Sequence, residues 1–180
     1  MRLFIGIDLP EELKRELLGF QTELKTLGVK GLWKAQDNFH ITLEYLGELD
    51  PSTVPLLSET LSQVARKHPS FRLNVGGLGS FPSFKRPHTL WTSVGGSLKE
   101  LNILRDELHH ELAQKRFALE DRPFKPHLTL ASRPELDGLD TASAQAKQLG
   151  EFVVAEVVLF ESKVIRGKRI YTHIFEERLC

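Results

Sequence analysis

A histidine followed two residues later by a threonine occurs twice in this chain, at His40 and Thr42 and again at His127 and Thr129. Side chains two positions apart on a strand project from the same face, so each pair would present an imidazole beside a hydroxyl. An imidazole titrates near pH ~6.5, so one histidine can accept a proton from water while the other donates one to a departing ribose oxygen. Threonine hydroxyls can donate to phosphate oxygens. These four residues predict hydrolysis of a cyclic phosphodiester.

The alternative for either motif alone is an ordinary strand histidine that is hydrogen-bonded to its surroundings. The repetition of the motif argues against this alternative. His-Ile-Thr-Leu and His-Leu-Thr-Leu lie 87 positions apart (127 − 40 = 87), close to half of the 180 residues. This spacing predicts two similar lobes that face each other and bring the two motifs together.

The hydrophobic pattern indicates which elements hold the motifs. Several neighbouring strands lack an intervening helix, which favours an α+β fold with antiparallel pairing over a doubly wound parallel sheet. No linker divides the chain, so residues 1–180 are expected to form one domain. The expected strands cover residues 2–8, 39–46, 71–75, 88–94, 127–131, 152–160 and 169–175; the expected helices cover residues 10–28, 53–67, 98–115 and a polar stretch near 142–149; and residues 76–77 and 81–82 are expected in a loop.

The composition narrows the kinds of partner. The chain has 24 Lys or Arg and 24 Asp or Glu residues, so it has no net positive field to attract long polyanions, and any nucleic-acid contact must be local. Cys180 is the single cysteine, which excludes an intramolecular disulfide and a thiolate metal cluster and favours a reducing cytoplasm. No apolar run approaches the roughly 18 residues of a membrane span, so a soluble protein is expected.

Longer segments around the motifs resemble a known family. These segments are RLFIGI at residues 2–7, Trp33 followed by NFHITLEYLG at residues 38–47, and FKPHLTL at residues 124–130. Together they resemble the 2H phosphoesterase superfamily. Within it they are most similar to bacterial and archaeal RNA 2′,3′-cyclic phosphodiesterases, also called 2′-5′ RNA ligases. The similarity extends over nearly the whole chain.

The resemblance implies a bilobal α+β fold with pseudo-two-fold symmetry, in which two intertwined lobes with antiparallel sheets line a central cleft and the helices lie outside. It implies hydrolysis of a 2′,3′-cyclic phosphate to a 2′-phosphate without a metal or cofactor. By position, His40 would donate a proton to O3′ and His127 would accept one from water, while Thr42 and Thr129 would hold phosphate oxygens. The expected partners are RNA ends with a cyclic phosphate, or cyclic nucleotides, and the expected state is a monomer.

Four basic residues are further candidates for contacts with RNA. Lys85 and Arg86 lie between aromatic residues in a loop, a pattern that suits single-stranded RNA, although a solvated loop explains it equally well. Lys125 precedes the second motif and could reach a phosphate. Arg133 departs from the family pattern, because related chains often end this motif with Leu-Ala-Arg whereas this chain has a serine before the arginine. Its side chain is therefore expected to face away from the cleft.

The sequence offers three alternatives to this hydrolysis. A metal hydrolase is poorly supported, because no His-x-His, acidic cluster or second histidine pair completes a ligand set. His68, His109, His110 and His173 are accordingly expected to have surface or capping roles. Reversible 2′-5′ ligation of RNA would follow from microscopic reversal of the hydrolysis. A binder of nucleotides or RNA ends without catalysis is the third alternative, but it would not need two titrating groups.

Overall fold

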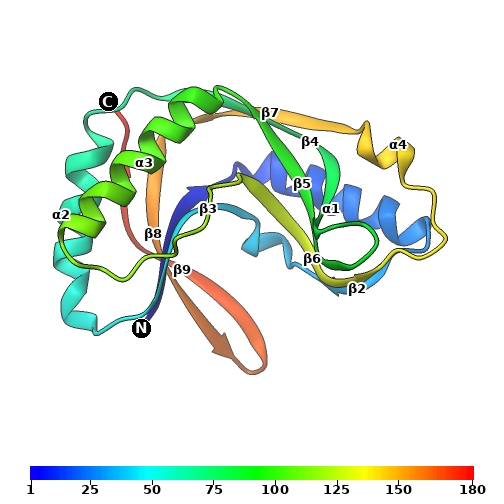
Figure 1. Cartoon of the computed structure of the whole chain (residues 1–180), viewed down its shortest axis with the longest axis horizontal. Coiled ribbons are helices and arrows are strands. Elements are labelled where there is room, and N and C mark those ends of the chain that lie inside the picture. Colours follow the sequence, from blue (N-terminus) through cyan, green and yellow to red (C-terminus); the bar gives the residue numbers. More distant parts are fainter.

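The strands of the computed structural model, which describes residues 1–180, form two antiparallel sheets (Figure 1). The four-stranded sheet has the order β3-β1-β8-β9, and the five-stranded sheet has the order β2-β6-β5-β4-β7. The predicted α+β fold with antiparallel pairing is confirmed. The strands are β1 (Arg2–Asp8), β2 (Lys30–Trp33), β3 (His40–Glu48), β4 (Phe71–Pro82), β5 (Pro87–Gly96), β6 (His127–Glu135), β7 (Gln148–Val154), β8 (Glu156–Ile165) and β9 (Lys168–Arg178). The α-helices are α1 (Glu11–Thr26), α2 (Val54–Ala65), α3 (Leu98–Gln114) and α4 (Ala142–Gln145), and two short 3₁₀ helices are η1 (Gln36–Asn38) and η2 (Pro51–Thr53).

The two motif strands pair in similar ways, although β3 lies at the edge of its sheet whereas β6 lies between β2 and β5. β3 pairs with β1, and a connection that contains α1 joins them, whereas β6 pairs with β5 through a connection that contains α3. His40 stands opposite Asp8, and His127 stands opposite Ser93. Each histidine is therefore the first residue of its strand, and it pairs with a residue in the second half of the partner strand.

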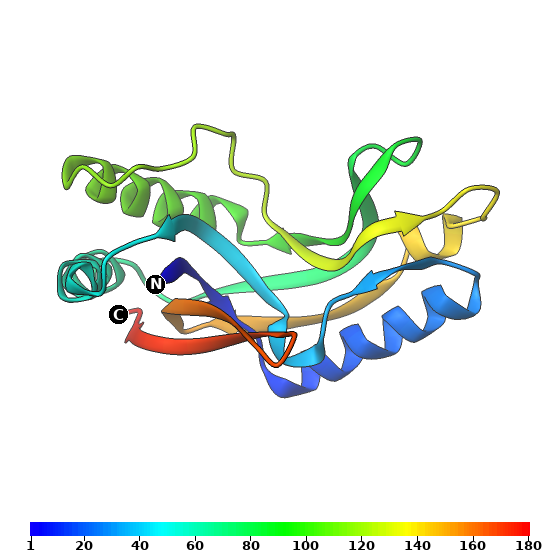
Figure 2. The ribbon, with the colours of Figure 1, turned by 90° about the horizontal axis from the view of Figure 1, so that it is seen from below.

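The helices cross from one sheet to the other. α1 follows a strand of the four-stranded sheet but packs against β7 of the five-stranded sheet. α3 follows β5 of the five-stranded sheet and packs mainly against α2, with smaller contacts to β3 of the other sheet and to β4. Figure 2 shows α1 and α3 on opposite outer sides of the molecule. This exchange is what two intertwined lobes require, while the assignment of residues 1–180 to one domain stays a prediction.

Strand β1 pairs with β3 and β8 along its two edges, and both of its faces are buried because each packs against apolar side chains. Leu3, Ile5 and Ile7 join the large apolar core, together with the α1 side chains at helical spacing. Phe4 points the other way and packs with Val158, in a small cluster on the opposite face. That second face carries the first histidine. None of the helices combines the length and apolar composition needed to cross a bilayer.

Four expectations about elements were wrong. β4 continues through the glycines at 76–77 and through residues 81–82, which were expected in a loop, because β7 pairs with it as far as Gly76 and β5 as far as Pro82. The short strand β2 was missed. The helix near residues 142–149 has only four residues, and its last positions belong to β7. The single strand expected over 152–160 is two strands that lie in different sheets, with Ala155 between them.

Candidate active site

The backbone holds His40 in a defined tautomer. Its Nδ1 atom lies 2.8 Å from the carbonyl oxygen of Asn38, and a carbonyl can only accept, so Nδ1 carries the proton. The Nε2 atom is then the acceptor, and it lies 2.8 Å from the hydroxyl oxygen of Thr42. The 3₁₀ helix η1 ends at Asn38 and turns this carbonyl toward the ring. His40 therefore presents an unprotonated Nε2 beside the threonine of its own motif.

His127 repeats this arrangement in the other sheet. Its Nδ1 atom donates to the carbonyl oxygen of Lys125 across 2.7 Å, again from two residues earlier in the chain. Pro126 lies between them and keeps Lys125 extended. Nε2 of His127 has no hydrogen-bond partner within the protein, and it is therefore available as a proton acceptor. The two imidazoles have the same tautomer for the same local reason.

Aromatic rings surround both histidines. The ring of His40 lies 4.7 Å from that of Phe4 and 5.1 Å, edge-on, from that of Tyr171, measured between centroids. The ring of His127 lies 5.0 Å from that of Phe81 and 6.2 Å from that of Trp91. These aromatic rings exclude water from one side of each imidazole. The protonated, charged form of the imidazole is therefore less well hydrated there than in water.

A glycine allows Trp91 to take its place beside His127. Gly79 stands opposite Trp91 in the β4–β5 pairing, and a Cβ atom at this glycine would come within 2.1 Å of the indole ring. Any side chain at position 79 would therefore displace the indole. The glycine-rich part of β4, which looks like a loop in the sequence, thus serves the packing of the site.

Burial is the main reason why the pKa values of His40 and His127 are lowered. It lowers the pKa of His40 to about 4, and the charges of Lys34 and His127 lower it further, against the raising effects of the Asn38 carbonyl and Asp8. The pKa of His127 is also lowered, first by burial and then by the charge of Arg122, while its hydrogen bond to Lys125 opposes this. Both imidazoles are thus neutral at pH 7 in the free protein.

The tertiary structure brings the two motifs together. Strands β3 and β6 contact each other although they belong to different sheets, and the two imidazoles are close enough for charge on His127 to lower the pKa of His40. Thr129 stands opposite Trp91, whose ring is near His127, so it lies on the same face as its histidine. The strands of the two motifs are therefore in contact, while the joint action of the two histidines and two threonines stays a prediction.

The four predicted basic contacts lie on the surface around this site. Lys85 and Arg86 are exposed in the loop between β4 and β5, and Lys125 is exposed beside the second motif. At the end of β6, a register shift places Ser132 opposite Thr89, which puts this serine, not Arg133, on the face of Thr129. Arg133 is exposed with a φ of 47°. Contacts between these residues and RNA stay predictions.

Sequence reasoning missed Lys34. Its Nζ atom lies 5.8 Å from the centroid of Tyr171, and its charge lowers the pKa of His40. The buried side chain of Gln21 fixes the local backbone, because its Nε2 atom donates to the carbonyl oxygens of Lys34 (2.9 Å) and Leu130 (3.0 Å). No short motif indicated this lysine, since its closeness to His40 depends on contacts between α1, β2 and β6.

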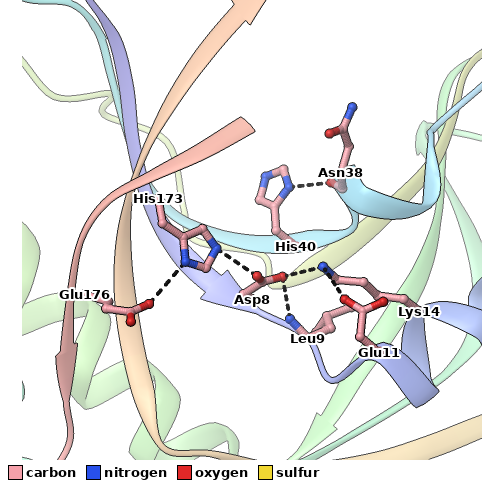
Figure 3. Close-up of polar contacts among 8 residues, drawn as sticks. All are labelled: Asp8, Leu9, Glu11, Lys14, Asn38, His40, His173 and Glu176. Carbon is pink, nitrogen blue, oxygen red and sulfur yellow. Dashed lines mark hydrogen bonds and ion pairs between the residues drawn. The ribbon is translucent and has the colours of Figure 1, made fainter. Parts of the chain in front are cut away.

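His173 is a second residue whose surroundings the sequence did not indicate. Figure 3 shows its ring between two carboxylates: Nε2 lies 2.8 Å from Asp8 Oδ2, and Nδ1 lies 3.1 Å from Glu176 Oε2. Lys14 binds the other oxygen of Asp8 at 2.9 Å. Asp8 stands opposite His40, so this network supports the strand position that carries the first histidine. His173 is exposed, in agreement with the expected surface role, and it also pairs with Asp8 and Glu176.

His109, for which a surface or capping role was also expected, is half-buried. Its Nδ1 atom contacts the carboxylate of Glu44, which is only 3% exposed. Nowhere in residues 1–180 do three or more His, Cys, Asp or Glu side chains gather as a set of metal ligands.

Comparisons with known proteins point to one family. The family model described as the 2′-5′ RNA ligase superfamily matches residues 23–164. A Thermotoga maritima protein named RNA 2′,3′-cyclic phosphodiesterase is 35% identical over 72% of this chain and 68% of its own length. One of the same name from Methanocaldococcus jannaschii is 29% identical over 98% and 99% of the two chains.

Solved structures give the same result for the fold. The structure of TT0787 from Thermus thermophilus superposes with a TM-score of 0.80 at 26% identity and covers 99% of this chain and 98% of that one. Escherichia coli LigT complexed with 3′-AMP superposes with a TM-score of 0.81 at 25% identity and covers 99% and 97% of the two chains. The similarity therefore includes both sheets and both motif strands.

Proposed function

This chain belongs to the 2′-5′ RNA ligase superfamily, and from that membership and its site we propose that it hydrolyses 2′,3′-cyclic phosphates at RNA ends to 2′-phosphates. The observation that carries the proposal is the matched pair of imidazoles. Each is held through Nδ1 by a carbonyl two residues earlier, which leaves Nε2 as the proton acceptor of each ring. Curated relatives named RNA 2′,3′-cyclic phosphodiesterase support the choice of substrate.

In the proposed reaction, water attacks the phosphorus atom and the bond between phosphorus and O3′ breaks. Nε2 of His127 accepts a proton from the water, and protonated Nε2 of His40 donates one to O3′. The products are a 2′-phosphate and a 3′-hydroxyl. Solvent then returns His40 to its protonated form and His127 to its neutral form. The hydrogen bonds at Nδ1 are alike in both rings, so these two roles rest on the family resemblance.

The lowered pKa values require that substrate binding promotes protonation. A bound phosphodiester carries a negative charge, which favours an imidazolium next to it and raises the pKa of that histidine. Once protonated, Nε2 of His40 can no longer accept the hydrogen bond from the Thr42 hydroxyl. That hydroxyl is then free to donate to a phosphate oxygen. Thr129, whose hydroxyl makes no hydrogen bond to His127, would donate to a phosphate oxygen from the other motif.

The surroundings suggest where the rest of the ligand lies. Lys85 and Arg86 are exposed on the β4–β5 loop, and Lys125 is exposed two residues before His127; all three suit the charge of RNA. A cyclic nucleotide alone would fill the phosphate position. The proposal includes a monomer that acts in the reducing cytoplasm, in keeping with its single thiol, Cys180.

The test is to incubate the protein, in the presence of EDTA, with an oligoribonucleotide that ends in a 2′,3′-cyclic phosphate. The position of the product phosphate can be read by phosphorus NMR. We expect a 2′-phosphate, and we expect that His40→Ala and His127→Ala each lose at least about 100-fold in kcat. His110→Ala, at an exposed position on α3, is the matched control. Near-normal rates in either motif variant, or a 3′-phosphate product, would contradict the proposal.

A further inference from the structure

The β8–β9 hairpin carries a run of positive charge that no carboxylate interrupts. Residues 162–175 contain four Lys or Arg residues and no Asp or Glu, although the whole chain contains equal numbers of both classes. Figure 1 shows the turn of this hairpin projecting beyond the rest of the molecule. The only ion pair of these cations joins Lys163 to Glu161 at 3.3 Å. The four exposed cations are Lys163, Arg166, Lys168 and Arg169.

One face of the β8–β9 hairpin lies on the same side of the four-stranded sheet as the side chain of His40. Tyr171 contacts the imidazole of His40 edge-on, and Arg169 lies two positions away on the same strand. Arg169 therefore points from the same face, about 7 Å nearer the turn. Its Nη1 atom donates to the Ser162 hydroxyl across 2.7 Å, and Ser162 stands opposite Tyr171. Val164, opposite Arg169, is 59% exposed.

Asn38 connects this hairpin to the first histidine. Its side-chain amide donates to the carbonyl oxygen of Arg169 across 2.9 Å, while its own carbonyl accepts from Nδ1 of His40. The strand that carries Arg169 and Tyr171 is thus fixed relative to the imidazole. A ligand that reaches His40 could continue along this face without leaving the protein surface.

We propose that the β8–β9 hairpin binds the nucleotides that precede the cyclic end, so that an RNA chain, rather than a cyclic mononucleotide, is the preferred substrate. This inference rests on the proposed function. Backbone phosphates would contact Arg166, Lys168 and Arg169, and bases would lie against Tyr171 and Val164, the combination of cations and flat or apolar surfaces that suits single strands. Because the whole chain is neutral, such attraction has to be local.

The experiment compares two substrates and two variants. The substrates are 2′,3′-cyclic AMP and a short oligoribonucleotide that ends in a 2′,3′-cyclic phosphate. The test variant is Arg166→Glu/Lys168→Glu, at the exposed turn. The control, Arg15→Glu/Lys99→Glu, makes the same change in net charge at exposed helix positions that have no ion pair.

We expect the test variant to lose about tenfold in kcat/KM on the oligonucleotide at low salt, through KM, and to keep its rate on cyclic AMP. The control should keep both rates. An equal loss on both substrates, or no loss on either, would overturn the proposal. If the parent protein cleaved neither substrate, the proposed function would fail, and binding of fluorescent RNA with a 3′-phosphate would still test the hairpin. The test variant should then flatten the salt dependence of log K by roughly one, and an unchanged slope would reject the hairpin as a binding surface.

Discussion

Arg105 of α3 and Glu44 of β3 form an ion pair inside the molecule, with Nη2 and Oε1 3.1 Å apart. The guanidinium also lies 5.3 Å from the centroid of the Phe124 ring. Glu44 follows Thr42 by two residues, and Phe124 precedes His127 by three. This pair therefore joins the strand of the first motif to the segment that leads into the second, and it helps to position both halves of the site.

Replacing Arg105 should strongly destabilise the fold. Arg105→Met would leave the buried carboxylate of Glu44 with the His109 imidazole as its one remaining partner, which costs up to roughly 3 to 5 kcal/mol of unfolding free energy. Urea denaturation measures this loss. Asp106→Asn is the matched control, because Asp106 is 73% exposed and lies 3.6 Å from the same guanidinium. It should change stability by less than about 0.5 kcal/mol. A loss below about 1 kcal/mol in Arg105→Met would show that the pair has little structural importance.

The pH dependence of kcat/KM should follow the two lowered pKa values. Activity needs one imidazole protonated and the other neutral, and kcat/KM reports these groups in the free enzyme. The pKa of His40 is about 4 and that of His127 is also lowered. The plot of kcat/KM against pH should therefore be bell-shaped, with its maximum below pH ~6.5. The kcat profile should lie at higher pH because bound phosphate favours protonation. A kcat/KM that stays level up to pH ~8 would contradict both shifts.

Burial of His40 should make the fold less stable in acid. The unfolded chain takes up a proton on this imidazole near pH ~6.5, whereas the folded chain does so only near pH 4, so falling pH favours unfolding between these values. The loss from His40 alone is roughly 3 kcal/mol and is complete below the folded pKa. His127 acts in the same direction. Urea denaturation at pH 7 and pH 4 should show a smaller acid loss in His40→Gln than in the parent protein. Equal losses would indicate an ordinary pKa.

Two glycine substitutions should have opposite effects. Gly79→Ala brings a methyl group against the Trp91 ring, so it should destabilise the fold and lower kcat by moving the wall beside His127. Gly19→Ala, on the exposed side of α1, meets nothing within 4 Å and should stabilise the fold by about 0.5 to 1 kcal/mol. Thermal unfolding and steady-state kinetics measure both effects. Normal activity in Gly79→Ala would mean that the indole position does not matter.

The sequence alone determined the chemistry of the site. His40 and Thr42, and their counterparts at 127 and 129, follow from strand periodicity, because two residues on one strand share a face whatever the rest of the chain does. The same local periodicity correctly indicated most helices and strands. It failed in β4, where glycines suggest a loop but neighbours on both sides complete the backbone hydrogen bonds.

Only the tertiary structure decided what surrounds the two histidines. Lys34 directly follows β2, while Tyr171 and Arg105 come from β9 and α3, and no spacing along the chain indicates that they meet at the motifs. Their positions depend on which strands pair and on which sheet each helix covers. The lowered pKa of His40 has the same origin, because burial is a property of the packed fold and not of the sequence next to the residue.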